Sequence, residues 1–150
     1  MANMFHKVIS LFNEIEKELI PTVVNSIKHY DFVLLDYNTN KQMNIKGETK
    51  KGEQIGNYTS QGYKRMRIKR GLQVEHVDLH FTGKFQATLE IVTNEKYFSI
   101  KANVDYADDI VKKYGADVLG IQQKYLEEFV KNYIIPDIKK MIHEKIKSYA

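Results

Sequence analysis

Three residues between His76 and Phe81 have side chains that could bind a metal ion. His76, Asp78 and His80 alternate along the chain, and two histidines with one carboxylate are a common ligand set for transition metals. On a β-strand these side chains would share one face, but successive ligands would lie roughly 6.5 to 7 Å apart at their Cα atoms and the outer two about 13 Å apart. Ligands spread over that length do not converge on one ion. We therefore expect a solvated strand face, with no metal and no cofactor.

A second group of carboxylates, Asp105, Asp108 and Asp109, has the residue types of a magnesium-dependent nuclease. These acids stand at the predicted start of a short helix, where capping and the helix dipole account for them. The chain contains no G-x-S-x-G elbow, no glycine-rich turn that opens a helix, no H-E-x-x-H motif and no cysteine. We predict that the protein is not an enzyme.

The strongest candidate for a binding function is the basic segment KRMRIKR, in which no acid interrupts the positive charges. Tyr58 and Tyr63 precede it, and clustered cations beside aromatic rings are typical of segments that contact phosphates. Alternation predicts an edge strand defended by charge. Five cations suffice for weak, salt-sensitive contact but not for sequence readout. The candidate residues that face DNA or a partner are Lys64, Arg65, Arg67, Lys69 and Arg70.

The length and composition of the whole chain limit what these segments can belong to. Its 150 residues fit a single domain, 1–150, able to bury one core. The hydrophobic fraction of 43% and the charged fraction of 28% are ordinary for a globular protein. A net charge of +4 favours acidic partners only mildly. No apolar run approaches the roughly 20 residues that span a bilayer, and the N-terminus lacks the features of a secretory signal, so we expect no membrane partner.

Helical periodicity dominates both ends of the chain. Apolar residues recur every three or four positions from 2 to 29 and again from 122 to 148. Pro21 and Pro136 lie inside these two patterns, so we expect a kink or a short break at each. A short helix is predicted from 105 to 115, with Gly115 as its stop.

Between the helices, the pattern favours β-structure and loops. The run 32–37 is consistent with a strand or a buried connector, and 38–61 is predicted to be a long polar loop or arm. Alternation predicts strands over 76–81, 85–91 and 97–104, the last two forming a hairpin. Thr82 and Gly83 interrupt the first two and form a candidate structural hinge. We therefore predict an α+β fold, in which an antiparallel sheet of at least three strands packs against long N-terminal and C-terminal helices.

Several segments resemble a known family. VDLHFTGKFQATLEIV (77–92) resembles the Thr-Gly signature of small tail-completion and head-to-tail joining proteins of tailed bacteriophages. NVDYADDIVKKYG (103–115) occupies the place of a second segment of that family, and DVLGIQQKYLEEFV (117–130) resembles its downstream helix. The polar stretch 38–61, followed by the basic segment, is similar to the versions found in crAss-like phages.

The resemblance implies a non-enzymatic structural virion protein that forms a ring at the head–tail junction, as a neck connector or tail-completion subunit. It also implies assembly in the host cytoplasm and a final place in the virion. The implied partners are copies of itself and other neck or tail proteins, such as portal-associated subunits, with non-specific DNA contact as a further expectation. The residues leave one alternative open, a small basic nucleic-acid-binding protein that uses segment 64–70.

Overall fold

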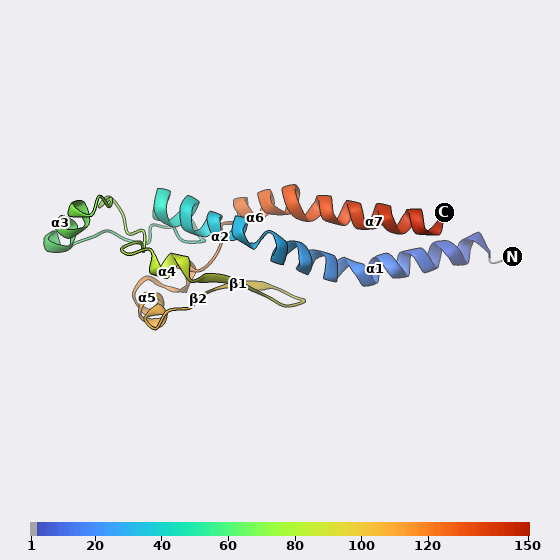
Figure 1. Ribbon diagram of the computed structural model, residues 1–150, viewed down its shortest axis with the longest axis horizontal. Coiled ribbons are helices and arrows are strands. Elements are labelled where there is room, and N and C mark those ends of the chain that lie inside the picture. The colour runs from blue at the N-terminus through green and yellow to red at the C-terminus, as the bar shows by residue number, and fades with distance from the viewer. Residues whose placement is uncertain (1–2) are drawn as a thin grey trace.

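The protein is elongated, and its two ends differ in architecture. A computed structural model of the chain describes residues 3–150. Helices α1 (Met4–His29) and α7 (Ile135–Tyr149) run side by side as an arm, with both termini at its far end (Figure 1). The remaining elements form a mixed helical and β body at the other end. The fold is thus α+β and mostly helical, with long N-terminal and C-terminal helices as predicted, and these two helices contact each other.

The arm is held by polar contacts as well as apolar packing. Ser26 donates a hydrogen bond to Asp137 at 2.5 Å, and Tyr149 donates one to Glu14 at 2.8 Å. Lys145 lies 3.5 Å from Glu14 in an ion pair. These contacts fix the two helices in antiparallel register.

Neither proline breaks the helix that contains it, so the short break, one of the two expected outcomes, is wrong. Pro21 lies inside α1, which continues without interruption to His29. Pro136 lies in the first turn of α7, and a π-helical turn, η3 (Val130–Ile134), joins that helix to α6 (Gln123–Phe129). Because proline lacks an N–H, the start of a helix is where its missing donor costs least.

Segment 32–37 is helical, so the strand, one of its two expected forms, is wrong, and the predicted loop at 38–61 begins as a helix. Helix α2 (Asp31–Asp36) runs directly into a π-helix, η1 (Tyr37–Asn44). Leu34, Asn38 and Gln42 are fully buried. Asn38 and Gln42 both donate to the carbonyl of Gly120, at 2.8 and 2.9 Å. Residues about 80 positions later thus accept from both buried amide groups, and the Gln122 N–H donates to Gln42 Oε1, whereas Asn38 Oδ1 has no partner among the described residues.

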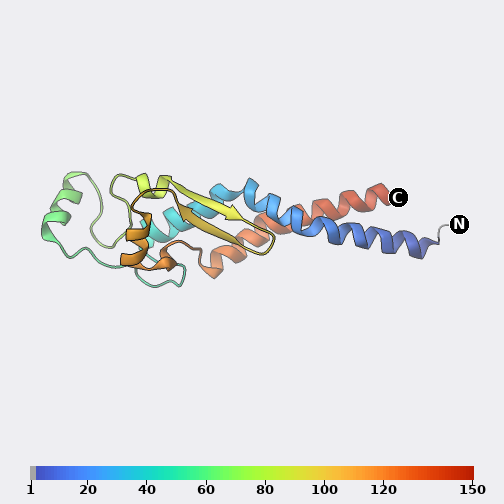
Figure 2. The ribbon, with the colours of Figure 1, turned by 90° about the horizontal axis from the view of Figure 1, so that it is seen from below.

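The β-structure is smaller than expected. Strands β1 (Leu89–Thr93) and β2 (Phe98–Ala102) pair as an antiparallel hairpin, with Ile91 opposite Ile100. The hairpin was predicted, but within residues 3–150 it is a two-stranded sheet instead of one with at least three strands. Segment 76–81 has no strand structure, and residues 84–87 form a short helix, α4 (Lys84–Ala87). Figure 2 shows the hairpin lying along the second half of α1.

The helix predicted at 105–115 is present as α5 (Ala107–Tyr114), followed by the 3-10 turn η2 (Ala116–Val118). Its N-cap is Tyr106, not Asp105, and it has no side-chain cap. The core lies between α2, α6 and the hairpin, and its most buried apolar members include Leu34, Val118 and Phe129.

Tyr37 is a core residue whose ring packs in the interior and whose hydroxyl forms a hydrogen bond at the surface of the core. Its hydroxyl donates to Glu128 at 2.9 Å, and its ring stacks on Tyr125 with 5.3 Å between centroids. Burial, followed by the hydrogen bond to Glu128, raises the pKa of Tyr37 to about 12. The folded state therefore keeps this phenol protonated to higher pH than the unfolded chain does.

This pKa shift predicts alkaline destabilisation. The Tyr37 contribution is constant below about pH 10, the unfolded pKa, and about 2 to 3 kcal/mol is lost between pH 10 and 12, because only the unfolded chain then releases the proton. Urea unfolding at pH 9 and pH 12 measures the loss. Tyr37→Phe lacks the group and should lose correspondingly less stability than the wild type. Equal losses in the two proteins would contradict the assignment.

Candidate functional site

The basic segment forms a helix, so the predicted edge strand is wrong. Helix α3 (Gln61–Lys69) begins at Ser60, whose Oγ accepts a hydrogen bond from the Tyr63 N–H at 3.2 Å. It ends in a left-handed glycine, Gly71, with φ of +71°. The N–H of Leu72 donates to the carbonyl of Arg67, and the N–H of Gly71 to that of Ile68, which is the Schellman pattern. Both ends of α3 are therefore set by local residues.

Arg67 anchors α3 to the body. Its guanidinium is fully buried and donates to Asp78 at 2.8 Å, to the His80 carbonyl at 2.7 Å and to the Gln73 carbonyl at 2.8 Å. Asp78 also accepts from the Tyr58 hydroxyl at 2.8 Å and from Gln73 at 2.6 Å. Every charge in this cluster is thus paired and hydrogen-bonded.

The burial of Arg67 removes it from the candidate surface. Because its side chain points inward to Asp78, it cannot contact DNA or a partner directly, contrary to the prediction. Arg65, Lys69 and Arg70 are exposed, and Lys64 is half-buried. Arg70 is held in place, since its guanidinium lies 4.3 Å from the Phe81 ring centroid. Helix α3, which carries these cations, lies at the end of the molecule farthest from the termini (Figures 1 and 2).

The histidines that flank Asp78 do not converge on it. The ring Nε2 of His76 lies 3.0 Å from the carbonyl of Asn44, and Nδ1 of His80 lies 3.3 Å from Gln86 Oε1. The predicted solvated strand face is wrong, since Asp78 is buried and segment 76–81 is irregular. Across residues 3–150, no cluster of three acidic or histidine side chains has metal-binding geometry.

The carboxylates at the start of α5 are surface groups. Asp108 and Asp109 occupy its first turn and are exposed, as is Asp105 just before it. Negative charge at that end of a helix is favoured by the dipole, as the sequence predicts.

Thr82 and Gly83 turn the chain into α4, and they do not join two strands. Gly83 has φ of +79°, and the N–H of Lys84 donates to the Thr82 hydroxyl at 3.3 Å. Leu79, four residues earlier, also has a positive φ of +57°. A bulky residue rarely adopts this conformation, which costs free energy that the surroundings must offset.

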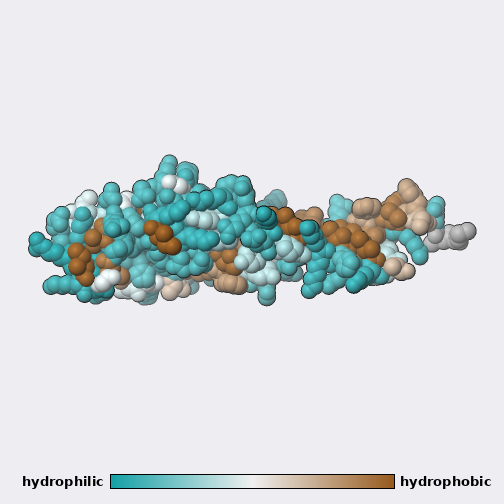
Figure 3. Space-filling view, turned by 90° about the horizontal axis from the view of Figure 1, so that it is seen from above, coloured by the Kyte–Doolittle hydropathy of each residue, from teal (hydrophilic) through white to brown (hydrophobic). Residues whose placement is uncertain are grey.

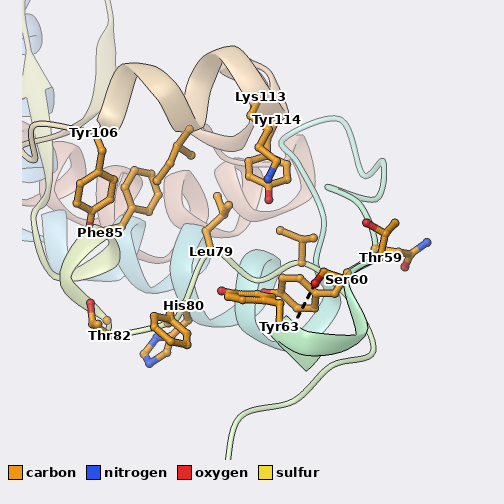
Figure 4. Close-up of a pocket in the computed structure, with 16 residues that line it drawn as sticks. Thr59, Ser60, Tyr63, Leu79, His80, Thr82, Phe85, Tyr106, Lys113 and Tyr114 are labelled. Atoms are coloured by element: carbon orange, nitrogen blue, oxygen red, sulfur yellow. Dashed lines mark hydrogen bonds between the residues drawn. The ribbon is translucent and has the colours of Figure 1, made fainter. Parts of the chain in front are cut away.

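Leu79 lines a cleft of about 480 Å³ beside α3. Figure 4 shows its side chain between Phe85 and Tyr63, with Tyr114 of α5 above it. Most of the lining is aromatic or aliphatic, and Ser60, the only serine there, is already engaged as the cap of α3. The cleft therefore suits apolar or aromatic groups.

No protein-family model, curated protein or solved structure matches this chain. None of the helices within residues 3–150 combines the length and apolarity that a membrane crossing requires. Two exposed surfaces lie at opposite ends of the molecule, one on the arm and one on α3.

Proposed function

We propose that the protein is a structural virion subunit of a tailed phage that forms a ring at the head–tail junction, as a neck connector or tail-completion protein. The resemblance of segments 77–92 and 103–130 to such proteins suggests this function. The observation that carries it is a row of large apolar side chains along α1 that no element of residues 3–150 covers. These include Phe5 and Phe12, each 65% exposed.

Such a row is costly on a free subunit. Contiguous exposed apolar surface usually marks a contact with another protein. The exposed apolar residues of α1 are Met4, Phe5, Val8, Ile9, Phe12, Leu19 and Ile20. Figure 3 shows apolar side chains gathered along the arm toward the termini. A subunit that is always assembled with its neighbours would cover them.

A ring would also account for the different surfaces at the two ends of the molecule. Repeated head-to-tail contacts need two unlike surfaces on each subunit, and they close into a ring when the rotation per subunit divides a full turn. The copies would be made in the host cytoplasm and incorporated in the virion beside portal-associated neck or tail proteins. Binding to those partners requires no catalysis.

Mass spectrometry of purified virions tests this function. The polypeptide should be present in a fixed ratio to the other neck proteins after the particles are washed in high salt. Its absence from intact particles would refute a structural role in the virion.

A second candidate function, non-specific nucleic-acid binding, is supported by the exposed cations of α3. Arg65 and Lys69 on α3 and Arg70 at its C-cap are exposed, Lys64 is half-buried, and α3 itself contains no acid. A ring around DNA could present these cations to the duplex, so the two functions are compatible.

Neutralising two of these cations should weaken DNA binding. In Arg65→Gln/Lys69→Gln, the slope of log K against log salt should become shallower by roughly 2, because two phosphate contacts are lost. Lys139→Gln/Lys140→Gln on α7 removes the same charge from the arm and should leave the slope unchanged. A titration of duplex DNA across a salt series measures both. Equal effects of the two double variants would show that α3 is not the DNA-binding surface.

A further inference from the structure

The first turns of α1 extend past its partner helix in the arm. Tyr149, the last residue of α7, contacts Ser10 and Glu14, so residues 4–9 lie beyond the end of that helix. Phe5, Ile9 and Phe12 share one face of α1 by their helical spacing, together with Val8. All four are exposed, and we call them the α1 tip.

The same chain carries an apolar groove farther along the arm. It has a volume of about 600 Å³ and lies between the second half of α1 and the turn of the β1–β2 hairpin. Tyr97 at its edge is 65% exposed, and Leu19 and Ile20 are also solvent-accessible. Its apolar lining includes Leu19, Ile20, Val23, Tyr97, Phe98 and Leu126, and Lys50, Glu95 and Lys96 also line it.

We propose that the α1 tip of one copy docks in this groove of the next copy, and that this contact joins neighbouring subunits of the ring. The inference rests on the proposed ring and identifies the two surfaces that form it. One contact would then cover the tip of one subunit and the groove of its neighbour.

The tip cannot fill the groove of its own chain. Both belong to α1, a continuous helix from Met4 to His29. Phe5 and Ile20 are fifteen residues apart, which places them about 22 Å apart along a helix axis. Since the helix does not fold back, the tip that enters a groove comes from another molecule.

The size of the surfaces fits a specific contact. From their exposed fractions, the tip side chains together with Met4 offer on the order of 500 Å² of apolar surface. The exposed groove side chains Leu19, Ile20 and Tyr97 add on the order of 300 Å², and the rim of the groove would supply the rest of the roughly 1,000 Å² that a specific interface buries. A symmetric tip-to-tip contact would close at two copies and would leave Leu19, Ile20 and Tyr97 uncovered. The head-to-tail arrangement covers both patches.

Cysteine cross-linking tests the contact directly, because the natural chain contains no cysteine. Phe5→Cys and Tyr97→Cys are prepared separately, mixed at high protein concentration and oxidised. A disulfide-linked pair containing one of each variant is expected. Phe5→Cys mixed with Ile68→Cys, on exposed α3, should give little of that pair. Efficient linkage of Phe5→Cys to itself, or equal yields from both mixtures, would overturn the proposal.

A matched pair of surface variants gives an independent test. Phe5→Ser/Phe12→Ser should reduce self-association of the full chain at least tenfold in sedimentation experiments. Phe32→Ser removes an equally exposed phenylalanine, 62% exposed on α2, and should have no effect. Circular dichroism confirms that each variant is folded.

The outcomes separate this contact from the ring itself. The docking proposal is overturned if rings persist in Phe5→Ser/Phe12→Ser and the mixture of Phe5→Cys with Tyr97→Cys gives no cross-link. The proposed function would still stand in that case. A chain that stays monomeric at every concentration would also overturn the docking proposal. Absence from virions would remove the proposed function separately.

Discussion

Replacing Arg67 by Met should lower the free energy of unfolding by about 3 to 5 kcal/mol, the cost of leaving a buried carboxylate without its partner. Arg67 is fully buried and provides the cation that Asp78 faces. The substitution also leaves the carbonyls of Gln73 and His80 without the donors that they have in the native protein. Urea denaturation measures the change.

Two controls define what this loss means. Arg65→Met changes an exposed arginine of the same helix in the same way and should alter stability by no more than about 0.5 kcal/mol. Arg67→Met/Asp78→Asn removes both charges and should be less damaging than Arg67→Met alone, because no unpaired charge stays buried. If Arg67→Met is as mild as Arg65→Met, Arg67 does not anchor α3.

Leu34→Ala should destabilise the protein by about 3 to 5 kcal/mol, since it opens a cavity at a side chain with no exposed surface. The same core cluster includes Tyr37, held by stacking and a hydrogen bond, and Phe129, held by stacking, so both have limited freedom to collapse into the space.

Phe32→Ala is the matched control on the same short helix. Phe32 is 62% exposed, so its truncation should cost less than about 1 kcal/mol. Thermal unfolding followed by circular dichroism distinguishes the two variants. A loss at position 32 equal to that at position 34 would contradict the packing of α2 against the core.

The terminal helices, α5 and the hairpin could be predicted because their signals are local. A sustained three-to-four periodicity identifies α1 and α7. The acids, lysines and glycine that flank α5 mark its two ends. The Asn94 turn marks the hairpin, since the side chain of Asn94 accepts from the N–H groups of Lys96 and Tyr97.

The errors arose where distant residues decide the structure. Asp78 occupies a polar position in an alternating pattern, and alternation alone cannot show that Arg67 pairs with it in the interior. The polar residues Asn38 and Gln42 similarly indicate a loop when taken locally, because the carbonyl of Gly120 that accepts from their amide groups is about 80 residues away. Burial of polar residues in this protein depends on tertiary partners that no local pattern shows.

The candidate site contained one signal that could have corrected the prediction. Ser60 and Gly71 bracket the basic segment at positions typical of a helix start and stop. In a helix between them, Arg67 lies on the same face as Tyr63, four residues earlier, and on the opposite face from Arg65. The role of Arg67 as an anchor could thus have been inferred, although not its partner.

The protein thus has an arm with an exposed apolar row on α1 at one end and the basic helix α3 at the other, and we propose that it binds its neighbours through the arm. The proposed ring is tested most directly by a cryo-electron microscopy reconstruction of the head–tail junction in virions that carry this chain. The account predicts a rotationally symmetric ring into which the elongated subunit fits, with each arm against the next copy. A junction fully explained by other proteins, with no density for this chain, would contradict it.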